Sequence, residues 1–158
     1  MSSAPDAIDI DVRGRPVPQG SGRSFVSGSR AVHVSTSAPL LAWRGAIATE
    51  ARAAMDGLPL LDGPVRVAMV FRPAERPASH FLPANGRRPA PELRLDAPVY
   101  HTGKPDADKL ARACLDALSS VAYRDDCQVA SLRVVKVWPN EGEAPGVSIR
   151  IRRLEATR

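Results

Sequence analysis

The fold of this chain is decided by residues 101–129, HTGKPDADKLARACLDALSSVAYRDDCQV, which also hold most of its chemistry. Asp106 and Asp108 stand at the start of a predicted helix, and a second pair, Asp125 and Asp126, follows its end. Carboxylates gathered this densely are usually held together by a divalent metal ion. The chain as a whole is basic, with 22 Lys and Arg against 17 Asp and Glu. An acidic segment in such a chain favours metal-assisted chemistry on a polyanion.

The middle of this segment predicts one continuous helix over residues 107–121. Pro105 favours a helix start because its ring fixes φ and because the first turn does not need its missing N–H. The apolar stripe of the helix, at three- and four-residue intervals, consists of Leu110, Cys114, Ala117, Leu118 and Val121. The opposite face carries Asp108, Arg112 and Asp116, which recur every fourth residue and so stack along the helix.

Two interpretations of these charged residues stay open. Asp106 and Asp108 either cap the helix and complement its dipole or bind a metal ion. Arg112 either forms surface ion pairs with its acidic neighbours or stabilises the charge that develops on a phosphate during hydrolysis. Carboxylates that hold Mg²⁺, together with a cation near the phosphate, are all that phosphodiester hydrolysis requires.

Length and composition limit the class of protein. With 158 residues the chain is expected to form one domain, and its net charge of +5 favours nucleic acid or an anionic surface as partner. The abundance of Arg, Ala and Pro is also typical of a GC-rich genome, which is the alternative explanation of the basicity. The sequence contains no zinc-binding Cys/His spacing and no GxxxxGK[ST] loop, so neither a zinc site nor a nucleotide cofactor is expected. The absence of a signal peptide and of a long apolar run predicts a cytoplasmic protein without membrane contact.

Hydrophobic periodicity predicts an α+β fold, in which a small mixed sheet carries two main helices on one face. In chain order we expect a frayed end over 1–6, a strand over 8–12, an irregular segment over 14–30, a helix over 39–55, a strand over 64–71, a long loop over 72–100, the helix described above, and strands over 129–137 and 146–151.

The two irregular segments are both basic. The first is rich in Gly, Pro and Ser, and the second contains six prolines. Each either contacts a phosphate backbone or is a plain solvated loop. The basic residues from which we expect DNA contacts are Arg15, Arg23, Arg30, Arg87, Arg88, Lys104 and Lys136.

Three pieces of the sequence closely resemble the RusA family of Holliday junction resolvases. They are PDADKLARACLDAL with the following DDCQV, the upstream GRPVPQGSGR, and Lys136 in RVVKVW. The resemblance implies a RusA-like homodimer that cuts four-way DNA junctions in recombination and repair. It further implies Mg²⁺ as cofactor, with Mn²⁺ as an alternative, and an origin in a phage or prophage.

The family motif assigns roles position by position. It implies that Asp106, Asp108 and Asp126 are the essential metal-binding carboxylates, and that Asp116 and Asp125 support them. Two positions depart from the motif, because Lys109 replaces an Asn and Arg112 replaces the important Lys. Arg keeps the charge but not the compact ammonium, so either Arg112 or Lys109 takes the role of that Lys.

The helix length sets a limit on this site. A helix over 107–121 is roughly 22 Å long, whereas Asp126 lies five residues beyond it, a reach of roughly 17 Å. Asp126 is therefore expected near the helix C-terminus, away from Asp106 and Asp108 of its own chain. Two antiparallel helices in a dimer would bring Asp126 of one subunit to Asp106 and Asp108 of the other. The alternatives are a broken helix or a separate role for Asp126.

Two other functions are compatible with the same residues. One is a nuclease of the same fold that acts on forks or flaps. The other is a non-catalytic basic DNA-binding module, in which the acidic residues only cap a helix.

Overall fold

The computed structural model describes residues 5–20, 23–34, 37–87 and 90–155. Its main sheet has four strands in the order β1-β8-β4-β7. The strands are β1 (Ala7–Arg13), β4 (Val65–Arg72), β7 (Val129–Lys136) and β8 (Gly146–Arg153). Neighbours pair antiparallel except β4 and β7, which are parallel, so the sheet is mixed as predicted.

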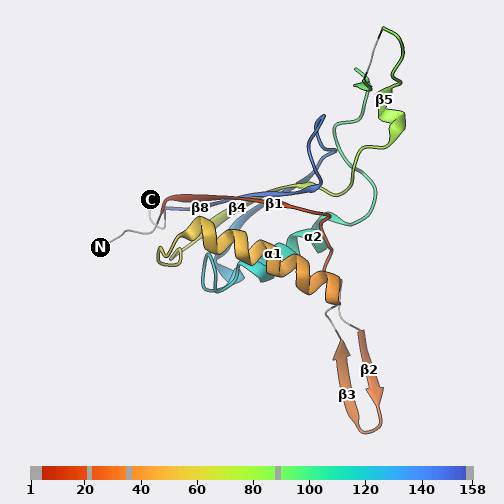
Figure 1. The fold of residues 1–158 in the computed structure, drawn as a ribbon. Coiled ribbons are helices and arrows are strands. Elements are labelled where there is room, and N and C mark those ends of the chain that lie inside the picture. Colours follow the sequence, from red (N-terminus) through yellow and green to blue (C-terminus); the bar gives the residue numbers. More distant parts are fainter. Residues whose placement is uncertain (1–4, 21–22, 35–36, 88–89, 156–158) are drawn as a thin grey trace.

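Two helices cover one face of this sheet, α1 (Ala38–Met55) and α2 (Ala107–Leu118) (Figure 1). Alternate residues of β1, β4 and β8 point toward the helices and are buried, as their two-residue periodicity predicts. The larger buried side chains of the core are Ile8, Ile10, Trp43, Ile47, Leu61, Met69, Phe71, Leu110, Leu118, Tyr123, Ile149 and Ile151. The predicted α+β class, with helices on one face, is confirmed. No helix in the described ranges is both long and apolar enough to cross a bilayer.

The second helix is shorter than predicted. It ends at Leu118 rather than Val121, and Ser120 adopts a positive φ of 63° directly after it. The helical hydrogen bonds stop here because the Ser120 N–H donates to the Tyr123 carbonyl at 2.7 Å, while the buried Tyr123 hydroxyl donates to the Leu115 carbonyl in the last turn of the helix. The chain therefore turns back at this point instead of adding another helical turn.

The prediction that residues 14–30 lack regular structure is wrong for their second half. A hairpin of β2 (Arg23–Ser27) and β3 (Arg30–Val34) projects from the body of the molecule (Figure 1). Ser27 pairs with Arg30, which leaves a two-residue loop, and Gly28 at its first position has φ +63°. Gly favours this conformation because it has no Cβ, so the glycine that suggested irregular structure in fact closes a hairpin.

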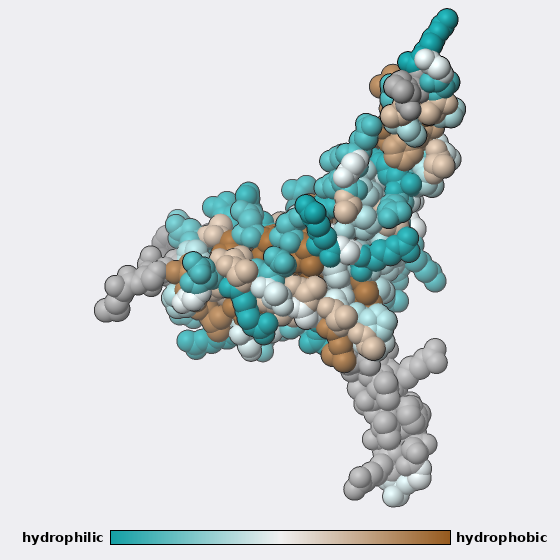
Figure 2. All heavy atoms as spheres, viewed as in Figure 1, coloured by the Kyte–Doolittle hydropathy of each residue, from teal (hydrophilic) through white to brown (hydrophobic). Residues whose placement is uncertain are grey.

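The long segment over 72–100 forms a second projection, which we call the arm (residues 73–98). In its described part, residues 73–87 and 90–98, the regular elements are the short η1 (Ala78–His80), β5 (Phe81–Leu82) and β6 (Glu92–Leu93). Apolar side chains lie at its surface (Figure 2), and Leu95 is fully exposed. The segment predicted as a long loop carries in its middle a small two-stranded sheet of its own, formed by β5 and β6.

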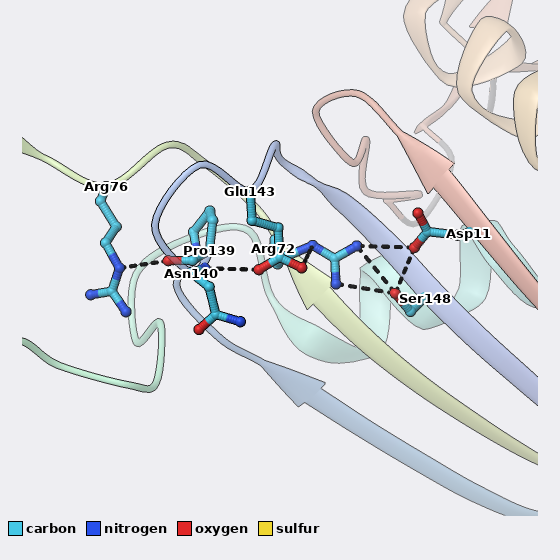
Figure 3. A network of polar contacts seen from close by, with 7 residues as sticks. All are labelled: Asp11, Arg72, Arg76, Pro139, Asn140, Glu143 and Ser148. Carbon is cyan, nitrogen blue, oxygen red and sulfur yellow. Dashed lines mark hydrogen bonds and ion pairs between the residues drawn. The ribbon is translucent and has the colours of Figure 1, made fainter. Parts of the chain in front are cut away.

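Arg72 is the exception within that prediction, since it is not a loop residue. It is the last residue of β4 and is only 6% exposed. Its guanidinium lies 3.2 Å from the Asp11 carboxylate, 3.3 Å from the Glu143 carboxylate and 3.1 Å from the Ser148 hydroxyl (Figure 3). Because these partners belong to β1, to β8 and to the turn before β8, Arg72 joins three segments where the arm begins.

A substitution at Gly146 tests how closely β8 packs against β1. A Cβ built at Gly146 in β8 would lie 2.2 Å from the Val12 backbone oxygen in β1, whereas nothing lies within 4 Å of one built at Gly45 in α1. We expect Gly146→Ala to lower the free energy of unfolding by about 1–3 kcal/mol through overpacking. Gly45→Ala should raise it by about 0.5–1 kcal/mol, because Ala is the better helix former. Urea denaturation of both variants measures the difference, and a Gly146→Ala protein as stable as wild type would contradict the β1–β8 register.

Candidate active site

Asp106 occupies the N-cap position of α2, yet its side chain does not cap the helix. One carboxylate oxygen lies 3.2 Å from the Lys109 ammonium, and both side chains are about half exposed. Asp108 lies in the first turn and is also exposed. The interpretation of Asp106 as a simple helix cap is therefore wrong, and its carboxylate is accessible to a ligand.

Lys136 connects the end of β7 to the loop that precedes α2. Its ammonium donates hydrogen bonds to the backbone oxygens of Gly103 at 2.6 Å and Pro105 at 2.8 Å. The His101 N–H donates to the Lys136 carbonyl at 3.0 Å in the same place. The end of β7 therefore lies beside Asp106.

The second acidic pair lies at the start of the same strand. Asp125 precedes the short helix η2 (Asp126–Gln128), and its carboxylate accepts a hydrogen bond from the Cys127 N–H at 2.9 Å. That hydrogen bond lowers the pKa of Asp125. Partial burial, and then the hydrogen bond and negative charge of Asp125, raise the pKa of Asp126, with a smaller effect from Asp116.

Gln128 holds this second pair in place. Its amide oxygen accepts hydrogen bonds from the backbone N–H groups of Arg124 at 2.8 Å and Asp125 at 3.3 Å. Its amide nitrogen donates to the carbonyls of Leu61 and Gly63 at 3.1 and 2.9 Å. The Gln of the DDCQV motif thus has a structural role that spacing alone does not indicate.

The carboxylates consequently form two groups at opposite ends of α2. Asp106 and Asp108 are at its start, while the charge neighbours of Asp126 are Asp125 and Asp116 near its end. Asp106 precedes and Asp126 follows the 12 residues of the helix, which is roughly 18 Å long, while Asp108 and Asp116 within it are roughly 12 Å apart along its axis. The predicted separation within one chain is therefore confirmed. Nowhere in the described ranges do three His, Cys, Asp or Glu side chains of one chain come together as a metal site.

Gln19 belongs to this region and was not predicted from the sequence. Its backbone N–H donates to the Lys109 carbonyl at 3.0 Å, and its side-chain amide donates a short hydrogen bond to the Asp116 carboxylate. Its amide oxygen is buried and has no partner among the described residues. Pro16 and Pro18 before it favour an extended backbone, but no local pattern indicates that this segment lies along α2.

Arg112 is exposed on the outer face of α2. Within the described part of the chain it forms no ion pair, so the alternative of a ladder of ion pairs with Asp108 and Asp116 is not observed. Lys109, in contrast, is paired with Asp106. Of the two cations in the helix, the Arg112 guanidinium is the one left available to a substrate.

The other basic residues predicted to contact DNA are spread over the molecule. Arg15 follows β1 and Lys104 precedes α2, and both are exposed. Arg87 is exposed in the arm, where its backbone N–H donates to the Asn85 side chain. Arg23 and Arg30 begin the two hairpin strands. Their side chains, and the whole of Arg88, fall outside what the structure describes.

Figure 1 shows the hairpin and the arm on opposite sides of the sheet and helices. The structure thus does not gather the predicted DNA contacts into one patch. The ammonium of Lys136 is already bonded to two backbone carbonyls, so this residue has a structural role in addition to its predicted one.

His101 should make stability depend on pH. It is 7% exposed, its ring centroid lies 4.3 Å from that of Trp138, and burial followed by the charge of Lys136 lowers its pKa. Since the unfolded chain then binds a proton more readily than the folded one, stability should fall as the pH drops below about 6.5. Urea denaturation between pH 7.5 and 5 should show a smaller decline for His101→Phe than for wild type. Equal declines in the two proteins would contradict the burial of this ring.

Comparison with known proteins agrees with this geometry. The sequence profile of the family described as "Endodeoxyribonuclease RusA" matches residues 14–152. A protein of Bacillus subtilis (strain 168) described as "Uncharacterized protein YqaN" is 30% identical over 152 residues, which cover 96% of this chain and 99% of the Bacillus protein. The profile match includes the extended segment around Gln19, all of α2 and the second acidic pair. The chain belongs to the RusA endodeoxyribonuclease family.

Proposed function

We propose that the protein is a Mg²⁺-dependent endodeoxyribonuclease that cuts four-way DNA junctions as a homodimer with two shared active sites. The observation that carries this proposal is the distribution of carboxylates at the two ends of α2. The family motif requires Asp106, Asp108 and Asp126 together, and neither end of the helix holds all three: Asp106 and Asp108 are at its start, and Asp126 is near its end.

A dimer whose two-fold axis crosses the outer face of α2 would bring all three carboxylates together. It would place two α2 helices antiparallel, so that the start of each helix meets the end of the other. Asp126 of one subunit would then lie near Asp106 and Asp108 of its partner. Each dimer would contain two such sites, related by symmetry.

Exposed apolar side chains support association on this side of the molecule. Leu132 lies on the helix-facing side of the edge strand β7, in register with the buried Val67, yet it is 46% exposed. Val99 and Tyr100, just before the loop that leads into α2, are 62% and 65% exposed. Apolar side chains that remain uncovered in one chain are typical of a surface that a second chain covers.

The residues of the site fit a hard divalent cation, because such ions prefer carboxylate oxygen ligands. Asp106, Asp108 and Asp126 would hold the ion, and when bound it would lower the pKa of a water molecule and polarise the phosphodiester. Mn²⁺ prefers the same type of ligand and would replace Mg²⁺.

Arg112 contributes the positive charge that the site requires near the phosphate. Its exposed guanidinium, one turn beyond Asp108, offers two parallel donors to the oxygens of one phosphate. It thereby stabilises the negative charge that develops as the nucleophile attacks. Lys109 is paired with the Asp106 carboxylate at the helix start, and it would have to release this carboxylate for Asp106 to hold a metal ion.

Two symmetric sites favour a four-way junction as substrate, since its resolution requires two symmetric cuts. The purified protein should therefore nick a labelled four-way junction in preference to linear duplex, fork and flap, with Mg²⁺ or Mn²⁺ but not with EDTA. Preferred cutting of forks or flaps would replace the junction with those substrates. Binding without cutting would identify a non-catalytic module and overturn the proposal.

Loss of any essential carboxylate should abolish cleavage. We expect Asp106→Asn, Asp108→Asn and Asp126→Asn each to stop nicking while binding the junction as tightly as wild type or more tightly. Each change removes a metal ligand and also a repulsion toward phosphate. Glu50→Gln on the exposed side of α1 is the control and should retain full activity. Near wild-type nicking by any of the three aspartate variants would show that the assignment of the site is wrong.

Mixed dimers separate shared sites from sites within one chain. A dimer of one Asp106→Asn chain and one Asp126→Asn chain has one site with both changes and one wholly wild-type site if the sites are shared. It should therefore make single nicks, whereas sites contained within one chain would leave both inactive. Tagged chains and purification of the mixed dimer establish that subunits have exchanged. An inactive mixed dimer would then rule out the shared arrangement.

A further inference from the structure

The helices cover only one face of the main sheet (Figure 1). Strand alternation and register place these residues on the other face, where each is exposed or half-buried: Asp9 and Asp11 from β1, Ser148, Arg150 and Arg152 from β8, Arg66, Ala68 and Val70 from β4, and Ser131, Arg133 and Val135 from β7. The face is thus rich in arginine. The function proposed above uses none of these residues.

Both carboxylates on the β1 side of this face are held in ion pairs. Arg150 forms two parallel hydrogen bonds with the Asp9 carboxylate, at 2.7 and 3.0 Å. These contacts lower the pKa of Asp9 and raise the pKa of Arg150. Asp11, the other carboxylate of the face, is paired with Arg72. No carboxylate of the face is left to pair with the remaining arginines.

Three arginines on the other side of the face have no acidic partner, and we call them the basic strip: Arg66, Arg133 and Arg152. In the antiparallel β4–β8 pair, Arg66 lies directly opposite Arg152. Among the described residues, Arg66 has one polar contact, a 3.3 Å hydrogen bond to the Ser131 hydroxyl. Within the described ranges the structure gives no ion pair to any of the three.

Three carboxylates lie near the strip, but none of them forms an ion pair with its arginines in the described part of the chain. Arg152 lines a shallow surface pocket together with Asp6, Asp62 and Glu155, but no ion pair forms across it. Like charges directly opposite each other on adjacent strands destabilise a sheet. Two arginines that lie opposite each other without an acidic partner are typical of a surface that binds an anion.

We propose that the basic strip binds the phosphate backbone of a DNA arm. The three arginines lie on the adjacent strands β8, β4 and β7, so the strip is roughly 10 Å wide at the usual strand spacing. That width corresponds to about three base pairs along the axis of duplex DNA. Guanidinium groups match phosphate oxygens bidentately, and the strip contains no aromatic side chain for stacking on bases. It binds DNA independently of sequence.

The strip lies at the end of the sheet nearest the second acidic pair. Asp126 lies three residues before the start of β7, where Val129 pairs with Val65. Arg66 is the next residue of β4. A DNA arm bound on the strip therefore continues past the edge of the sheet toward Asp126. This inference rests on the proposed function only in taking DNA as the substrate.

Junction binding at increasing salt, measured in EDTA so that no cleavage occurs, tests the proposal. Each of Arg66→Gln, Arg133→Gln and Arg152→Gln should flatten the log–log dependence of affinity on salt by about one unit, and the triple variant by about three. Between 50 and 200 mM salt the wild type should accordingly lose roughly 40-fold more affinity than the triple variant. In the presence of Mg²⁺ the triple variant should show a raised KM and an unchanged kcat.

Two controls separate the strip from a general effect of charge. Arg52→Gln removes one exposed positive charge from α1 on the opposite side of the molecule, and its salt dependence should equal that of wild type. The double variant Asp9→Asn with Arg150→Gln removes a neutral pair from the same face at constant net charge, and should also behave as wild type. Circular dichroism and thermal melts confirm that every variant is folded.

The possible failures are distinguishable. An unchanged salt dependence in a triple variant that still nicks the junction would overturn the strip and leave the proposed function intact. A change in oligomeric mass in place of a change in salt dependence would identify the strip as a protein-binding surface and overturn it as well. A wild-type protein that binds no DNA would contradict both proposals.

Discussion

The two hydrogen bonds from the Lys136 ammonium to the backbone around Pro105 fix the geometry on which the acidic site depends. They hold the end of β7 at the start of α2. Because the second acidic pair lies directly before β7, it must then lie about one strand length away, near the end of the helix. Helix and strand run in opposite directions over this distance, and neither can be shortened without loss of the core. The division of the carboxylates into two groups is thus a consequence of the fold rather than of flexible side chains.

Much of this arrangement could be predicted from local sequence. Alternating apolar residues in β1, β4 and β8 identify strands with one buried face, and the spacing from Leu110 to Leu118 identifies the buried side of α2. The distance between the acidic groups follows from helix rise and chain reach alone. In each case the residues that form the pattern also make the contacts.

The remaining features depend on partners far away in the sequence. Gln19 and Asp116 are separated by 97 residues, and Arg72 and Ser148 by 76. The end of α2 depends on hydrogen bonds with Tyr123, which lies a few residues beyond the helix and outside its three- and four-residue period, and not on a helix-breaking residue. In the hairpin, a glycine needed for the left-handed turn is the same residue type that suggests irregular structure. Composition and periodicity contain no information on such long-range polar contacts.

The separation of the acidic groups also has a consequence for control of the activity. A single chain holds only part of each metal-binding set, so on the shared-site proposal a newly synthesised chain has no cutting activity of its own. At concentrations well below the dimer dissociation constant, the amount of complete enzyme rises with the square of the chain concentration. A few stray copies would leave DNA intact, whereas a modest rise in expression would produce a steep rise in cleavage. The length of one helix would thereby set a concentration threshold for a reaction that is dangerous to the genome.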